Sequence, residues 1–76
     1  MNKDRRMEIE EIKDQIESIK SDIETVKDEE QDTFDTLNEG LQACPSGQKM
    51  EAAITKMDDA LTSLDAALNN LTEAQA

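Results

Sequence analysis

The sequence of 76 residues contains no histidine, tryptophan or tyrosine, and only one cysteine, one proline and one phenylalanine. A single cysteine excludes an internal disulfide, and without histidine the usual ligand set of a zinc site is incomplete. One core in so short a chain, built with almost no aromatic rings, supplies little stability. Because these usual sources of stability are missing, the composition predicts one small domain that buries further apolar surface by oligomerisation.

Basic residues are also scarce, with 8 Lys and Arg against 19 Asp and Glu and a formal net charge of −11. This balance argues against direct binding of nucleic acid and against an anionic membrane surface, since both require clustered positive charge. No stretch is apolar and long enough to span a bilayer, and no apolar signal segment follows the charged residues 1–6. We therefore expect a cytoplasmic protein, and the lone cysteine fits a reducing compartment.

Apolar residues in the first half of the chain repeat in alternating steps of three and four. Isoleucine occupies positions 9, 12, 16, 19 and 23, and Val26 continues the series. This spacing is the heptad pattern of a helix with one apolar seam. The seam is interrupted by the polar residues Glu30 and Thr33 and resumes at Phe34, which predicts a helix over residues 3–41. Phe34 is expected to fill the core near the turn.

The segment 42–48 contains the only strong break, because Pro45 cannot continue the preceding helix and Ser46 is a good N-cap. Gly40 is either a weak point near the end of the first helix or its left-handed cap. A second seam then predicts a helix over residues 49–73, with fraying from Glu73 onward. The members of this seam are again three and four residues apart: Met50, Ile54, Met57, Leu61, Leu64, Leu68 and Leu71.

Residues beside the two seams predict how the helices pair. One flank of the first seam carries lysine every seventh residue, and the same flank of the second carries acids. In an antiparallel pair these flanks face each other, and the short connection also requires antiparallel neighbours. The predicted fold is therefore all-α, an antiparallel, coiled-coil-like helical hairpin. The facing residues are Lys13, Lys20 and Lys27 on one helix and Glu51, Asp58 and Asp65 on the other.

The opposite flank of the second seam carries alanine at positions 53, 60, 67 and 74. Small residues allow close approach of another helix, although alanine is also simply a good helix former on a surface. The first predicted helix is longer than the second, which leaves Ile9 and Ile12 without a partner in the same chain. We expect a homodimeric four-helix bundle, either parallel or antiparallel. Its predicted contact residues are Ile9, Ile12, Ile16, Ile19, Ala53, Ala60 and Ala67.

An acidic run in the second half of the first helix is the main candidate for binding another protein. Its spacing partly matches a calcium-binding EF-hand loop, but Thr33 replaces the required glycine and disfavours that interpretation. The run is either a solvated helical face or a surface that imitates a nucleic-acid backbone and binds a basic protein. The predicted partner-binding residues are Asp28, Glu29, Glu30, Asp32, Asp35 and Glu39.

The sequence contains no pattern typical of catalysis. No nucleophile and base, glycine-rich phosphate loop or metal-ligand cluster can be identified, and Cys44 has no basic neighbour to activate its thiol. We therefore expect a non-enzymatic protein without a metal or cofactor. A small-molecule site at a dimer junction is disfavoured by the scarcity of aromatic and cationic side chains.

The acidic segment 28–42 together with the amphipathic segment 50–71 resembles small acidic helical proteins of bacteriophages and prophages. The resemblance covers about two thirds of the chain and carries no catalytic or ligand residues with it. It implies a phage accessory protein, a class that includes inhibitors of host defence such as anti-restriction and anti-CRISPR proteins, many of which imitate nucleic acid.

Two functions remain open from the sequence. The first is a phage-encoded inhibitor whose acidic face blocks a basic site on a host defence or nucleic-acid-binding protein in the host cytoplasm. The alternative is a structural protein, such as an assembly, scaffold or small chaperone subunit, that uses its apolar seam.

Overall fold

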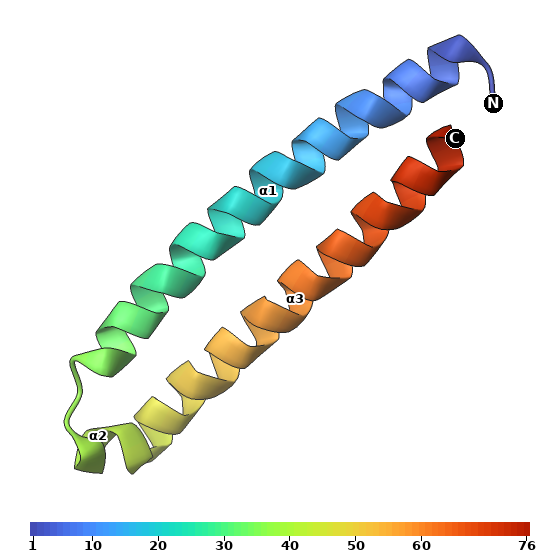
Figure 1. Cartoon of the computed structure of the whole chain (residues 1–76). Helices are drawn as coiled ribbons and strands as arrows, with labels where there is room; N and C mark the ends of the chain where they lie inside the picture. Colours follow the sequence, from blue (N-terminus) through green and yellow to red (C-terminus); the bar gives the residue numbers. More distant parts are fainter.

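Two long helices lie side by side in opposite directions and are joined by a short third one (Figure 1). The computed structural model describes all residues 1–76. Helix α1 spans Lys3–Asp35, α2 spans Glu39–Ala43 and α3 spans Pro45–Gln75, and there is no strand. The all-α class and the hairpin are thus as predicted from the two apolar seams.

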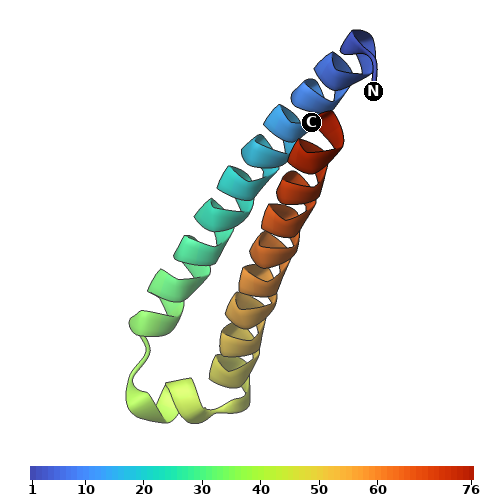
Figure 2. The same ribbon diagram turned by 45° about the vertical axis from the view of Figure 1, so that its right-hand side comes forward.

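The hairpin is narrow and long, with extents of 57 × 15 × 12 Å over the Cα atoms. Figure 2, turned by 45°, again shows α1 and α3 running alongside each other, with both termini at the end opposite α2. None of the helices is apolar enough over a sufficient length to cross a membrane.

The seam side chains pack between α1 and α3, as the heptad pattern predicts, but two helices alone cover them only partly. Leu68, at 9% exposure, is the one buried apolar residue, and no side chain is buried completely. Its neighbours in the seam, such as Ile16, Ile23 and Leu61, are half-buried. A hairpin of this kind offers each side chain one neighbouring helix, whereas a core position in a bundle touches several.

The end of α1 differs from the predicted boundary, since the helix ends at Asp35 and not at residue 41. The backbone N–H of Thr36 still bonds to the carbonyl of Asp32, and the chain then leaves the helix. Asn38 starts α2, because its side chain accepts a hydrogen bond from the N–H of Leu41 at 2.9 Å. The side-chain amide of Gln42 donates to the carbonyl of Phe34 at 3.1 Å, and the same carbonyl accepts from the backbone N–H of Leu37 at 3.1 Å.

The predicted loop 42–48 is also replaced, because α2 and the first turn of α3 occupy it. Proline is favoured in the first turn of a helix, where its missing N–H has no intrahelical partner, and α3 begins directly at Pro45. Ser46 therefore lies inside the helix, and Cys44 is the N-cap residue, without a side-chain capping bond. Gly40 has no positive φ, which excludes the left-handed cap, and lies within α2.

Gly47 is buried where α3 passes over α2. A Cβ atom at this position would collide with the backbone of Leu41 and Gln42. The absence of a side chain at Gly47 therefore allows the sharp fold between the two helices.

At the other end, α3 continues to Gln75 and does not fray from Glu73. The Gln75 amide donates to the carbonyl of Arg6 at 3.1 Å and to Glu10 at 2.8 Å. The predicted overhang of α1 is consequently wrong, because α3 starts earlier and ends later than expected and reaches Arg6. Ile9 is half-buried in this arrangement, while Ile12 is exposed.

Candidate functional site

One edge of the contact between α1 and α3 is closed by polar side chains, and we call it the lysine edge. The Nζ atom of Lys27 lies 2.7 Å from a carboxylate oxygen of Asp58, and Lys20 forms the equivalent ion pair with Asp65. These two pairs confirm the predicted opposition of the flanks for Asp58 and Asp65, whereas the predicted Glu51 is exposed and forms no ion pair. The lysine stems lie along the seam, so that their side chains are only 18% and 26% exposed for Lys20 and Lys27.

Lys13 belongs to the same edge but has different partners. Its amine donates to the Gln75 side chain at 2.9 Å and lies 3.6 Å from Glu10. The next position in the row of Asp58 and Asp65 is Thr72, which has no charge to pair with a lysine. Gln75 lies one helical turn after Thr72 and contacts Lys13 in its place. The lysine edge is thus defined by Lys13, Lys20, Lys27, Asp58, Asp65 and Gln75.

These contacts shift the protonation equilibria of the groups involved. The hydrogen bond to Asp65 raises the pKa of the Lys20 amine, and the hydrogen bond to Asp58 raises the pKa of Lys27, in both cases against partial desolvation. The hydrogen bond from Gln75, followed by the charge of Lys13, lowers the pKa of Glu10. All three shifts favour the charged form.

The other edge of the same contact is an open apolar groove of about 390 Å³. We call it the open groove. Asp22 stands on its α1 side and Lys56 on its α3 side. Its apolar lining is Ile19, Ile23, Val26, Met57 and Ala60.

The groove continues a row of apolar side chains that α1 leaves uncovered. Ile12, Ile19 and Val26 are 45%, 49% and 53% exposed and recur at seven-residue spacing. They belong to the predicted seam, but α1 is rotated so that its lysine row faces α3 and this row does not. The exposure of Ile12 therefore comes from this rotation and not from an overhang.

The residues predicted to form a dimer fall into two groups. Ile9 and Ile16 are half-buried against α3 and contribute to the hairpin itself. Ile12 and Ile19 are exposed on the open side of α1. On α3, Ala53 and Ala60 are exposed and Ala67 is half-buried, and Ala60 lines the open groove.

The predicted acidic residues also separate in the structure. Asp28, Glu29, Asp32 and Asp35 are exposed on α1. Glu30 is half-buried in the stripe that faces α3, and Glu39 lies beyond the end of α1, in α2. The six residues therefore do not form one surface.

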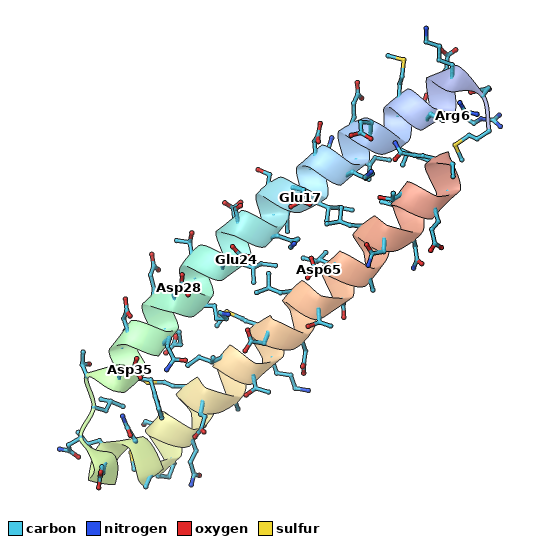
Figure 3. The ribbon with its side chains drawn as sticks, in the orientation of Figure 1. Arg6, Glu17, Glu24, Asp28, Asp35 and Asp65 are labelled. Atoms are coloured by element: carbon cyan, nitrogen blue, oxygen red, sulfur yellow. The ribbon has the colours of Figure 1, made fainter.

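A longer acidic surface instead follows the side of α1 that points away from α3. Figure 3 shows Glu17, Glu24, Asp28 and Asp35 one after another along α1, with Asp65 on the other helix. All are exposed. We define the acidic outer face by its members Asp14, Glu17, Glu24, Asp28, Asp32 and Asp35.

Two further groups bear on chemistry. The acids with EF-hand spacing are not gathered by the fold, since no cluster of three or more acidic or cysteine side chains is placed to hold a metal ion. The Cys44 thiol is free and donates to the carbonyl of Leu41 at 2.8 Å. Cys44 therefore contributes to the turn.

The open groove is the feature that the sequence alone did not locate. Its signal was present in the lysines at seven-residue spacing beside the isoleucine seam. Long lysine side chains that cross the contact rotate α1 toward their own row and expose the isoleucine row on the far side.

Comparison of the chain with known protein families, curated proteins and solved structures finds no match among any of the three. The candidate surfaces are therefore the lysine edge, the open groove and the acidic outer face, as the geometry of this chain presents them.

Proposed function

We propose that this chain is a non-enzymatic protein-binding hairpin that presents its acidic outer face to a basic surface of another protein. The observation that carries this proposal is the placement of the cations of α1. Lys20 and Lys27 interrupt the acidic sequence, but both are drawn to the lysine edge and paired with acids of α3. Lys20 also lies 3.9 Å from Glu17, while the other five acids of the outer face form no ion pair.

The charge of the acidic outer face is spaced more widely than the charge of a nucleic-acid strand, but on the same scale. Its six acids lie between Asp14 and Asp35. At about 1.5 Å per residue they span about 32 Å, or one charge per about 5 Å of axis, against about 3.4 Å for one DNA strand. A basic groove that binds nucleic acid is therefore a suitable partner, and its encounter with this face is accelerated electrostatically.

The biological role that fits this chemistry is inhibition of a defence or nucleic-acid-binding protein. Together with the phage-like pattern of segments 28–42 and 50–71, it supports a phage-encoded inhibitor acting in the host cytoplasm. Such an inhibitor needs no catalytic group or cofactor, because occupying the basic site is sufficient.

The open groove supports a second element of the proposal, a homodimer in the form of a four-helix bundle. One hairpin buries a single apolar residue, Leu68, and leaves Ile12, Ile19 and Val26 about half exposed. A row of large exposed apolar residues is typical of a surface that another chain covers. A second hairpin supplies the two further helices that a bundle core requires.

The same apolar row favours the alternative function, an assembly, scaffold or small chaperone subunit that binds through its seam. The two functions use different surfaces of α1. Substitutions on the acidic outer face and in the open groove therefore distinguish them.

The test is capture of bacterial lysate proteins on the immobilised chain at about 0.05 and 0.5 M salt, with release by short double-stranded DNA. We expect wild-type protein to retain nucleic-acid-binding proteins at low salt and to release them to DNA and to high salt. A triple variant D28N/D32N/D35N should lose them.

The matched control is E51Q/D59N/E73Q, which removes the same charge from exposed positions of α3 and should retain the captured proteins. Absence of any specific partner at both salts, or capture that survives the α1 triple variant, contradicts the acidic-face proposal. Loss on Ile19→Gln alone supports the assembly alternative.

A further inference from the structure

The two sides of the open groove carry opposite charge. Asp22 stands on the α1 side and Lys56 on the α3 side. Seven residues nearer the turn on each helix, on the same faces, α1 has Glu29 and α3 has Lys49. The groove is thus a strip of apolar side chains between an acidic rim and a basic rim.

The lysines of the basic rim have no acidic partner within the chain. Lys13, Lys20 and Lys27 all lie within 4 Å of a carboxylate in the same chain, while Lys49 and Lys56 form no ion pair. Both are exposed. Apart from Lys3, Arg5 and Arg6 near the N-terminus, Lys49 and Lys56 are the basic residues without an ion pair, and both lie on α3.

The ion pairs of the lysine edge fix the level of each rim residue along the hairpin. Lys27 lies opposite Asp58, and Lys20 opposite Asp65. Glu29 comes two residues after Lys27, and Lys56 comes two residues before Asp58. Glu29 and Lys56 therefore lie at the same level along the hairpin, on opposite sides of the groove.

We propose that the open groove binds the open groove of a second copy, with the two-fold axis parallel to the helices. In this arrangement α1 packs on the partner's α3, and both turns lie at the same end of the dimer. Glu29 then meets the partner's Lys56, and the symmetry forms this contact twice. The inference rests on the proposed homodimer and specifies its arrangement.

The other face-to-face arrangement has its two-fold axis across the helices and turns at opposite ends. It places α1 on α1 and α3 on α3, so that each acidic rim meets an acidic rim and each lysine rim meets a lysine rim. Like charges placed directly opposite are destabilising. With −11 on each chain, the arrangement that pairs the free lysines with acids is favoured.

The size of the surface suits a stable dimer. The face that shows both helices measures 57 × 15 Å over the Cα atoms. This is similar to the roughly 800 Å² that each partner buries in an ordinary specific interface. The exposed alanines of α3 permit close approach of the partner's α1.

Cys44 offers a direct test without any substitution, because it is the only cysteine and lies at the turn. A nitroxide is attached to Cys44, and the distance between the two labels is measured by double electron–electron resonance. Circular dichroism verifies that the labelled chain is helical, and sedimentation verifies the dimer.

With the turns at one end, helices at the usual interaxial spacing of about 8–10 Å place the labels within about 30 Å of each other. With the turns at opposite ends the labels are separated by about the length of the hairpin, 57 Å. A dimer with the long distance overturns this arrangement and leaves the homodimer standing. A chain that sediments as a monomer at about 100 µM, well above the dissociation constants usual for specific dimers, overturns both.

A charge exchange tests the named contact. Glu29→Lys and Lys56→Glu should each raise the dissociation constant of the dimer about tenfold, and the double variant should restore it. Glu24→Lys makes the same charge change on the acidic outer face and should leave dimerisation intact. Equal weakening by Glu24→Lys, or a double variant no better than the single ones, contradicts the contact.

Discussion

Both edges of the α1–α3 contact are formed by residues at seven-residue spacing, but one edge is closed by ion pairs and the other is open. On the lysine edge, long side chains span the gap between the helices and form ion pairs with Asp58 and Asp65. On the groove edge, Ala60 and Asp22 are too short to do so, and an apolar groove remains open. The comparison teaches that polar side chains beside a seam decide which apolar row is covered within the chain and which is left for a partner.

Removing the buried residue that both edges share has the largest expected effect. Leu68→Ala should lower the free energy of unfolding by about 2 to 5 kcal/mol, since it leaves a cavity in a core with little other buried surface. Chemical denaturation followed by circular dichroism measures the change.

Leu41→Ala is the control for this prediction, because Leu41 is 49% exposed and its truncation should cost less than about 1 kcal/mol. Equal losses for the two variants would show that Leu68 is not the centre of the contact.

The turn holds the two helices so that the lysine edge is formed, and Gly47 is its tightest point. Gly47→Ala should cost about 1 to 3 kcal/mol, because the added methyl group meets the backbone of Leu41 and Gln42. Thermal unfolding measures the loss.

Gly40→Ala is the matched control, since the added methyl group meets only the Asn38 side chain, at an ordinary 3.4 Å. This variant should be neutral or should stabilise the helix. Similar destabilisation by both alanines would contradict the packing of α3 on α2.

Alkaline pH should weaken the lysine edge and spare the groove. The folded-state pKa values of Lys20 and Lys27 are raised, so their contribution is fully present below the unfolded-state value of about 10.4 and is lost as pH rises through the folded values. The melting temperature should therefore fall as pH rises above about 10.4.

The variant K20M/K27M removes the groups whose pKa is raised and should lose most of this pH dependence. The pH dependence that Glu10 contributes has the opposite sign, because its folded-state pKa is lowered. Its contribution to stability is present above the ordinary pKa of a glutamate and is lost as pH falls through the folded-state value. An unchanged alkaline transition in K20M/K27M would assign the effect to other groups.

The smallest expected effect on the stability of one hairpin comes from the groove. Ile19→Gln should change the unfolding free energy of the dilute chain by only about 0.5 kcal/mol, since Ile19 is already 49% exposed. The same substitution at the half-buried Ile23 should cost several times more. Equal effects at the two positions would mean that the groove edge is not open.

The sequence predicted the class of the fold and the pairing of its charges from local rules. The seam isoleucines and leucines specify two helices, and seven-residue spacing of Lys20, Lys27, Asp58 and Asp65 specifies their antiparallel orientation. These features are repeated many times, so that chance irregularities do not change the result. The register, with Lys27 opposite Asp58 and Lys20 opposite Asp65, is seen only in the structure.

The helix boundaries at the turn were not predicted correctly. They depend on single contacts between residues that lie apart in the chain, such as the Gln42 amide on the Phe34 carbonyl and the missing Cβ of Gly47. The rotation of α1 was also not predicted. The heptad pattern assigns two isoleucine rows to one seam, and it does not show whether the row of Ile12 and Ile19 or the lysine row faces α3.

Solvent accessibility of the isoleucine and valine methyl groups, measured by relaxation from a soluble paramagnetic probe over a range of protein concentrations, tests the contrast between the edges most directly. In dilute solution we expect Ile12, Ile19 and Val26 to be strongly relaxed and Ile9 and Ile16 to be protected. As the concentration rises and a second copy covers the groove, the first three should become protected as well. Methyl groups of Ile19 and Val26 that stay accessible at every concentration, or are already as protected as Ile16 in dilute solution, would contradict the account.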